Sequence, residues 1–348
     1  MNAFEFRSRI GATANYALSL CALAILPTSA ALAENQVAPL NYFLHSYGPA
    51  STPTMFLGWV FASLLVAIFV IIALLLLMAI FRKRPAVAPG LLGREDEGMR
   101  WVYIGTGLSA CILFALAIYT LITLNAIAKP TRAPALTLTV TGYDWWWKVE
   151  YEDDDPTRSF VTANEIHIPV GQPVLVKLKS ADVIHAFWVP MLAGKTQMIP
   201  GLTNQQWLQA DVEGVYSGQC TQYCGVQHAH MGLEVVAQSE DEFRTWQDAQ
   251  RRAADMTAGV DAGKALFMDR CAGCHAIRGT EAVGAHAPDL THLNSRRLIA
   301  AGLLTKSPDH LVQWITHAQD LKPGARMPNM VLSAAEVDAL SAFLSTLN

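Results

Sequence analysis

Two long apolar runs limit the folds open to this chain more than any other feature. Residues 55–81 and 101–128 contain no charged side chain. Each is longer than the roughly 20 residues that cross the hydrocarbon core of a bilayer as a helix. The short segment between them carries the basic side chains of Arg82, Lys83, Arg84, Arg94 and Arg100. Because short basic loops stay on the cytoplasmic side, residues 34–130 are predicted to form a transmembrane hairpin with both ends outside.

The first residues are typical of a secretory signal. Arg7 and Arg9 form a basic start, residues 17–26 form an apolar centre, and the small-residue pattern Ala-Leu-Ala follows. This pattern predicts a signal peptide over residues 1–33; the alternative is an uncleaved first membrane helix. Both the signal and the hairpin place everything after Lys129 in the periplasm or its equivalent.

The charge and the cysteines narrow the classes of function. The formal net charge is -4, from 25 Lys and Arg against 29 Asp and Glu, and no Lys/Arg-rich tract occurs. Nucleic acid is therefore not an expected partner. Four of the six cysteines lie in the exported part: Cys220, Cys224, Cys271 and Cys274. Disulfides are the default for exported cysteines, but the neighbours of these four indicate cofactor sites.

Residues 131–240 show short alternating strands separated by turns that contain glycine. The expected strands are 136–140, 145–151, 165–169, 174–179, 206–209 and 232–236. Many short strands at this spacing are typical of a Greek-key barrel or sandwich. Residues 241–256 are charged and free of Gly and Pro, which predicts a helical linker.

Residues 257–348 are predicted to form an all-α domain. The expected helices are 261–271, 308–318 and 333–347, and Ser333 with Glu336 forms a capping box for the last one. The fold class expected from the whole sequence is therefore a multidomain membrane protein. It combines a two-helix transmembrane hairpin, a Greek-key β-barrel domain and an all-α domain.

The helical region carries the sequence Cys271-Ala-Gly-Cys274-His275, which is the attachment motif of a c-type haem. Two cysteines three residues apart at a helix end lie on one side, where their sulfurs can bond the two vinyl groups of one porphyrin. The adjacent His275 can then bind the iron. A thioredoxin-like Cys-x-x-Cys is the alternative, but no βαβ pattern surrounds the motif.

The sixth ligand of the iron is expected to be a downstream methionine, since Met/His ligation suits an electron carrier. Here residues 260–347 resemble the class I cytochrome c family, which also uses a Pro carbonyl, here that of Pro288, to hold the ligand His. In that family the Met of a Met-Pro pair is the axial ligand, which implies Met327. Met330 is the nearby alternative.

A second cluster precedes the haem motif. Cys220, Cys224, His228 and Met231 fall within one short segment, and His185 lies apart from them. Soft thiolate and thioether ligands together with imidazoles select copper. A blue-copper centre uses one cysteine, so two indicate a pair of coppers bridged by both thiolates, each completed by one histidine. Zinc and a disulfide between the two cysteines are the alternatives.

From about residue 40 to residue 237, the chain resembles subunit II of the haem–copper cytochrome c oxidases. That family has a two-helix anchor and a cupredoxin domain with a dinuclear copper centre called CuA. The resemblance implies as copper ligands the side chains of His185, Cys220, Cys224, His228 and Met231, and the backbone carbonyl of Gln222. With a cytochrome c domain behind it, the whole resembles the caa3-type subunit II.

The tract of residues 143–147 resembles an aromatic stretch of the family, whose first tryptophan passes electrons towards subunit I. The resemblance assigns that role to Trp145, whereas Trp146 and Trp147 are expected to pack the barrel or the membrane surface. The family has Glu between the two cysteines, and its side chain reaches a magnesium ion shared with subunit I. Here the residue is Gln222, so copper binding through the main chain is retained and magnesium binding stays open.

The resemblance implies a relay in the respiratory chain. Electrons from cytochrome c or a cytochrome bc complex enter the haem c, pass to CuA, and leave for subunit I. There oxygen is reduced to water and protons are pumped. The implied partners are subunits I and III and membrane lipid. The implied location is the bacterial inner membrane, with both the N- and C-terminal parts outside.

Two other functions compete with this hypothesis. The same cofactors would serve the subunit through which electrons enter a CuA-containing nitric oxide reductase, and Gln222 is the one hint in that direction. A membrane sensor or copper-delivery protein belongs to a different class. It needs no haem, so the haem-attachment motif argues against it.

Overall fold

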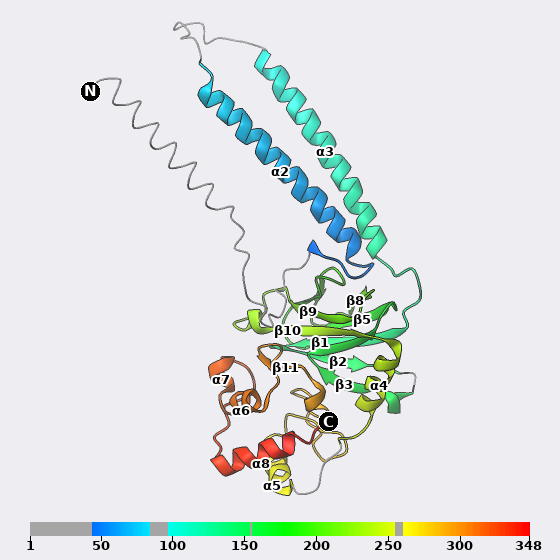
Figure 1. Ribbon diagram of the computed structural model, residues 1–348, viewed down its shortest axis with the longest axis vertical. Helices are drawn as coiled ribbons and strands as arrows, with labels where there is room; N and C mark the ends of the chain where they lie inside the picture. Colours follow the sequence, from blue (N-terminus) through cyan, green and yellow to red (C-terminus); the bar gives the residue numbers. More distant parts are fainter. Residues whose placement is uncertain (1–43, 84–96, 154, 255–259) are drawn as a thin grey trace, which may run out of the picture. The chain divides into compact units, whose positions relative to one another are not determined.

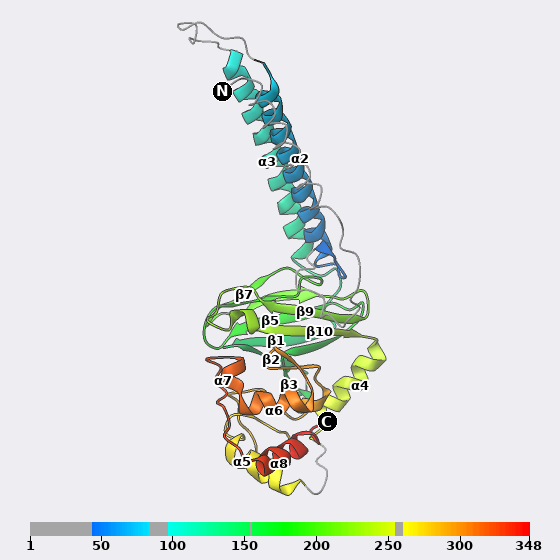
Figure 2. The same cartoon turned by 60° about the vertical axis from the view of Figure 1, so that its left-hand side comes forward.

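The computed structural model describes residues 44–83, 97–153, 155–254 and 260–348 (Figures 1 and 2). These residues belong to one compact unit. The predicted signal peptide, with Cys21, and most of the basic loop lie outside the described residues.

Two long apolar helices cover almost all of the residues predicted to span the membrane. α2 (Thr52–Phe81) and α3 (Glu97–Ile127) have 30 and 31 residues, which corresponds to about 45 Å each. α2 has no buried residue. A helix that is apolar on every side and covered by no protein needs lipid around it. The Ser51 and Trp207 side chains each donate a 2.7 Å hydrogen bond to a main-chain carbonyl where the helices meet the next domain.

The region after α3 is the expected β domain, built from two five-stranded sheets. One sheet has the order β3-β2-β1-β5-β8 and the other β4-β10-β9-β6-β7. The β1–β5 and β4–β10 pairs are parallel and the others antiparallel. The strands are β1 (Leu136–Tyr143), β2 (Trp146–Tyr151), β3 (Phe160–Ala163), β4 (Glu165–Pro169), β5 (Val174–Ser180), β6 (His185–Trp188), β7 (Thr196–Met198), β8 (Asn204–Leu208), β9 (Gly214–Cys220) and β10 (Gly232–Gln238), with short 3-10 turns η2 (Pro156–Arg158) and η3 (His228–His230).

The core of this domain lies between the two sheets. Alternate residues of each strand face inwards, as the strand period of two requires; β5, for example, alternates buried and half-buried positions. Trp147 and Phe187 are fully buried and meet edge to face, with ring centroids 5.9 Å apart. The expected packing role of Trp147 is therefore correct.

Four strands were absent from the sequence prediction: β3, β6, β7 and β9. β6 and β7 are very short, and β9 mixes glycine with polar residues, so none shows a clear alternation over a long stretch. β6 begins at His185 and β9 ends at Cys220. The strands that were hardest to predict thus carry two of the candidate ligands.

The predicted linker forms α4 (Glu240–Arg251) and packs against the β domain (Figure 2). The ring of Trp246 stacks on His167 at a centroid distance of 4.0 Å. Arg251 pairs with Asp153 at 2.9 Å. These contacts hold the first part of the linker as a docked helix.

The last domain is helical, as expected. It contains α5 (Asp261–Arg270), α6 (Pro308–Thr316), α7 (Ala318–Leu321) and α8 (Ala334–Leu344), with turn η4 (Leu293–Ser295) and a small hairpin of β11 (Leu298–Ile299) and β12 (Leu304–Thr305). Its own core includes Phe267 and Phe343, whose rings lie 5.6 Å apart. The predicted capping box at Ser333 and Glu336 is present.

Candidate metal and cofactor centres

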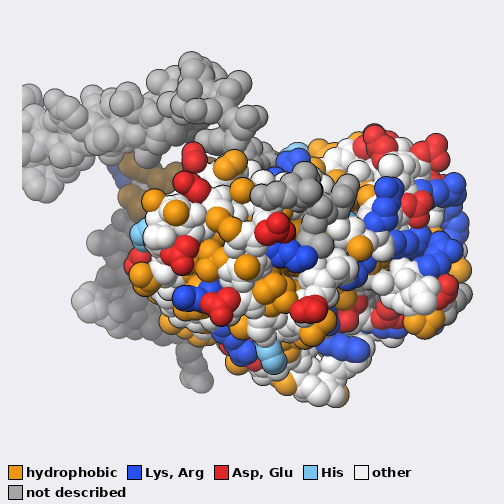
Figure 3. Space-filling view, turned by 90° about the horizontal axis from the view of Figure 1, so that it is seen from below, with side chains coloured by type: hydrophobic (Ala, Val, Ile, Leu, Met, Phe, Trp, Pro, Cys, Tyr) orange, Lys and Arg blue, Asp and Glu red, His pale blue; other side chains and the backbone are white. Residues whose placement is uncertain are grey.

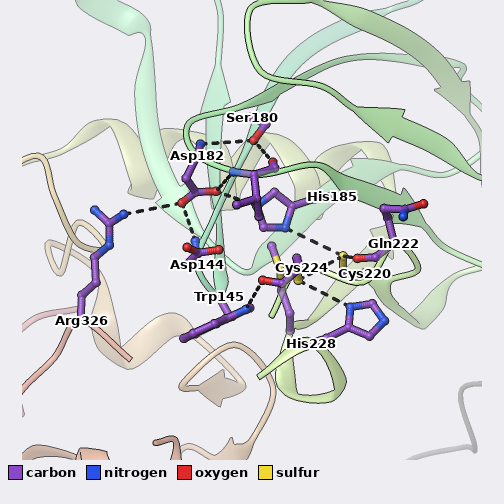
Figure 4. A network of polar contacts seen from close by, with 12 residues as sticks. Asp144, Trp145, Ser180, Asp182, His185, Cys220, Gln222, Cys224, His228 and Arg326 are labelled. Atoms are coloured by element: carbon purple, nitrogen blue, oxygen red, sulfur yellow. Dashed lines mark hydrogen bonds and ion pairs between the residues drawn. The ribbon is translucent and has the colours of Figure 1, made fainter. Parts of the chain in front are cut away.

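The structure brings all six predicted copper ligands together at one end of the β domain (Figure 4). The two cysteine sulfurs lie 3.8 Å apart. The Nδ1 atom of His185 is 3.9 Å from the sulfur of Cys220, and that of His228 is 3.5 Å from the sulfur of Cys224. The sulfur of Met231 lies 3.8 Å from that of Cys224. The Gln222 carbonyl oxygen lies 3.2 Å from the sulfur of Cys220.

The spacing of the two sulfurs fits a shared metal better than a disulfide. A disulfide needs about 2.05 Å between its sulfurs, and both cysteines are free. Two sulfurs 3.8 Å apart can both bind one ion at about 2.3 Å. Such a position exists on each side of the line that joins the two sulfurs. One imidazole stands beside each sulfur, so the donor set fits two soft metal ions.

The thiol pair also has the electrostatics of a cation site. The hydrogen bond from Cys224 lowers the pKa of Cys220, while the same contact and burial raise the pKa of Cys224. Two thiolates this close repel each other, so a single proton is shared in the absence of a cation. Positive charge at the site would allow both sulfurs to ionise.

Asp182 orients the first histidine. Its Oδ1 accepts a 2.8 Å hydrogen bond from Nε2 of His185, which leaves Nδ1 facing the sulfurs. Burial lowers the pKa of His185, but the hydrogen bonds to Asp182 and Cys220 outweigh it and raise the pKa to about 9. Asp182 was not singled out from the sequence. The signal available was a carboxylate three residues before a ligand histidine.

The second centre is a cavity of about 370 Å³ that is lined mostly by the helical domain, with Asp144, Trp145, Trp146 and Asn164 of the β domain. Cys271, Cys274 and His275 line it, together with Met327 and Met330. Most of the remaining lining is apolar, as a porphyrin requires. Because both methionines line the cavity, the choice of Met327 as axial ligand stays a prediction.

The environment of His275 suits an iron ligand. Its Nδ1 donates a 2.7 Å hydrogen bond to the carbonyl of Pro288, as the resemblance implied. That bond fixes the tautomer and leaves Nε2 free to bind a metal. Burial lowers the pKa of His275, which favours the neutral imidazole that metal binding needs.

A buried arginine gives an independent test of the haem assignment. Arg296 lines the cavity and is 9% exposed, and its Nε has no hydrogen-bond partner among the described residues. Its Nη2 donates to the carbonyl of Asp289 and nearby carboxylates favour its charge, but a buried donor such as Nε is costly to leave unpaired, and the propionates of a haem are acceptors that could pair with it. The residues present therefore fit a haem. No sequence pattern indicated this role for Arg296, because an arginine in a loop is normally solvated.

Trp145 lies between the two centres. Its Nε1 donates a 2.9 Å hydrogen bond to the carbonyl of Cys224, and it also lines the haem cavity. Gly225, at a φ of 116°, makes room for the ring, since a Cβ there would lie 2.9 Å from an indole carbon. The family resemblance implies a path from Trp145 towards a partner subunit, and this stays a prediction. Within this chain, Trp145 contacts both candidate centres.

Figure 3 shows a face of the molecule on which acidic and basic side chains both occur. In the acidic sequence at residues 150–155, some of the described carboxylates have basic partners. Glu152 pairs with Lys177 at 2.6 Å, and Asp153 pairs with Arg251 at 2.9 Å. These ion pairs weaken the negative field that could attract a basic partner.

Comparisons with known proteins match both domains that carry the candidate centres. The family described as cytochrome C oxidase subunit II, periplasmic domain, matches residues 154–239, and the family described as cytochrome c matches residues 260–348. Cytochrome c oxidase subunit 2 of Alkalihalophilus pseudofirmus is 32% identical over 81% of this chain and 83% of its own length. The same subunit of Bacillus sp. (strain PS3) is 27% identical over 77% of this chain and 80% of its own length.

Solved structures of the same kind are also similar. The crystal structure of the periplasmic domain of subunit II of cytochrome oxidase from Bradyrhizobium japonicum has 29% identity and a TM-score of 0.33. The match covers 35% of this chain and 97% of that chain.

Proposed function

The chain belongs to the cytochrome c oxidase subunit II family, and from this premise we propose that it is the subunit through which electrons enter a respiratory haem–copper oxidase of the caa3 type. The observation that carries the proposal is the arrangement of two cofactor sites on either side of Trp145 in one chain. As a member of this family it is a subunit of an oxidoreductase associated with a catalytic subunit I.

Each centre has a set of residues with separate tasks. His185, Cys220, Gln222, Cys224, His228 and Met231 would hold a dinuclear CuA centre; Cys271, Cys274, His275 and Met327 would hold a covalent haem c. When bound, the haem would supply a one-electron donor and the copper pair a one-electron acceptor. The protein orients the ligands and excludes water, and the Trp145 indole bridges the two sites.

The remaining partners follow from this role. Cytochrome c or a cytochrome bc complex would reduce the haem, and subunit I would receive the electrons and reduce oxygen to water while pumping protons. Subunit III completes the expected assembly. The chain would cross the bacterial inner membrane twice, with both cofactor domains on the periplasmic side.

The test is made on the full chain, purified with its partner subunits from membranes. Copper per haem c, the electron paramagnetic resonance spectrum, and turnover with oxygen and with nitric oxide are measured. We expect three coppers per haem c in the complex, two from this chain and one from the haem–copper site of subunit I, together with one unpaired electron shared by both copper nuclei of this chain and turnover with oxygen. A mononuclear copper spectrum would refute the CuA assignment. Turnover with nitric oxide alone would refute the oxidase assignment.

A further inference from the structure

A buried lysine stands where the two cofactor domains meet. Lys322 follows α7 and opens the loop that leads to Met327. Lys322 is buried and only 2% exposed. Its ammonium donates to three main-chain carbonyls, those of Trp145 at 2.9 Å, His230 at 2.7 Å and Ala300 at 2.9 Å.

Two of these three carbonyls belong to the β domain, at segments that serve the copper site. The Trp145 ring is hydrogen-bonded to the carbonyl of Cys224, and His230 stands directly before Met231. The third carbonyl, of Ala300, lies in the turn between β11 and β12 of the helical domain. A lysine ammonium has three donors, and all of them are used here.

The turn that supplies Ala300 is itself held in an unusual conformation. Ala300 and Ala301 have φ values of 55° and 59°, which side chains other than glycine rarely adopt. Ala301 accepts a 2.9 Å hydrogen bond from the Gly232 amide of β10. Such strain persists only where the surroundings determine the conformation, so the contact between the domains is a specific one.

A neighbouring contact supports the same junction. The Gln227 side chain donates a 2.9 Å hydrogen bond to the carbonyl of Pro323, the residue after Lys322. The start of the haem-ligand loop is thus bonded at two successive residues to the segment that carries the copper ligands. By contrast, Lys306 donates only within its own domain, to the carbonyl of Asn294 at 3.3 Å.

We propose that Lys322 is a positioning residue that fixes the haem-ligand loop on the copper domain. Electrons then pass between the two centres in a permanently docked arrangement, and the cytochrome domain does not swing on its linker during turnover. This inference rests on the proposed function, because it concerns transfer between the same two sites.

The experiment compares Lys322→Met with the matched control Lys306→Met in the purified oxidase complex. A laser flash in the presence of a ruthenium polypyridyl complex reduces the haem, and its reoxidation by copper is followed optically. For the wild type and for Lys306→Met we expect one phase whose rate is independent of added glycerol. For Lys322→Met we expect a rate at least tenfold lower, equivalent to about 1.4 kcal/mol, that decreases further with viscosity.

The haem and copper spectra and the reduction potentials of Lys322→Met are also measured. If they equal those of the wild type, a lower transfer rate reflects a loss of positioning and not damage to either site. If Lys322→Met transfers electrons as fast as the wild type, the proposal is overturned. It is also overturned if the rate of the wild type itself decreases with viscosity, and this second measurement remains decisive if Lys322→Met does not fold. Absence of haem or of dinuclear copper from the wild type would be a failure of the proposed function, which the spectra detect before any rate is measured.

Discussion

Replacing Asp182 by Asn tests the copper site without changing a ligand or the size of a side chain. Each carboxylate oxygen of Asp182 has its own partners. Oδ1 accepts from Nε2 of His185 and from the Val183 amide, both at 2.8 Å, and Oδ2 accepts from the Asp144 amide at 2.8 Å. Arg326 approaches Oδ2 at 3.8 Å. An amide has one acceptor oxygen, so its NH₂ group must face one of these donors.

The expected loss of copper affinity follows from the hydrogen bonds that an asparagine amide cannot accept at this position. If the oxygen stays on His185, the Asp144 amide loses its partner, which costs about 1–3 kcal/mol. If the amide flips, the histidine loses the group that fixes its tautomer. Loss of such a carboxylate behind a metal-bound histidine typically lowers metal affinity about 10- to 100-fold. We expect Asp182→Asn to lower copper affinity by this factor, equivalent to about 1.4–2.8 kcal/mol.

Copper affinity is measured by competition with a chelator in the full chain, with the haem spectrum as the internal reference. Asp153→Asn is the matched control, since it removes a carboxylate and an ion pair of the same domain without contacting a ligand. Arg326→Gln removes only the longer ion pair and should change the affinity little. A copper affinity of Asp182→Asn within twofold of the wild type, or an equal loss in Asp153→Asn, would refute the reasoning.

Three further outcomes are expected. Trp145→Phe removes the indole N–H that bonds to the copper loop, and should slow flash-induced electron transfer at least tenfold at unchanged potentials; an unchanged rate contradicts the bridging role. Gly142→Ala places a Cβ 2.8 Å from the ring of His185, and should destabilise the β domain by about 1–3 kcal/mol in calorimetry, whereas Gly194→Ala, with open space around it, should not. Hydrogen bonds from the neighbouring imidazole and from a main-chain amide outweigh burial and lower the pKa of Glu165 below its usual 4.5. The ionised Glu165 therefore stabilises the fold above pH 4.5, and this stabilisation is lost as the pH falls through the lowered pKa. Glu165→Gln should have a smaller free energy of unfolding than the wild type at neutral pH, and the difference should shrink in acid. A difference that does not change with pH contradicts the assignment.

The candidate ligands could be predicted because their chemistry is local. Cys271, Cys274 and His275 are adjacent in the chain, and most of the copper donors share one loop, so residue type and spacing were sufficient. The two spans were predictable for a similar reason, since an apolar run of that length has few alternatives. The Gln222 carbonyl and the choice of Met327 over Met330 were the exceptions, because only the family resemblances implied them.

The contacts between the domains could not be predicted in this way. Lys322 is far in the chain from Trp145 and His230, and no local pattern distinguishes it from the solvated lysine that is the usual case. The same holds for Arg296 beside the haem cavity and for Asp182 behind the ligand histidine. Their roles depend on tertiary packing, which places them in surroundings that neither periodicity nor spacing encodes.

The packing at the junction also decides how a tethered cytochrome can work. A flexible tether alone supplies an effective concentration in the millimolar range. The two Lys322 hydrogen bonds that cross between the domains, to the carbonyls of Trp145 and His230, at about 1 kcal/mol each, would add roughly a 30-fold preference for the docked state. Under the proposed function, a docked cytochrome domain would keep the haem beside the copper centre in every turnover, so electrons delivered to the haem would need no search step before they reach the copper.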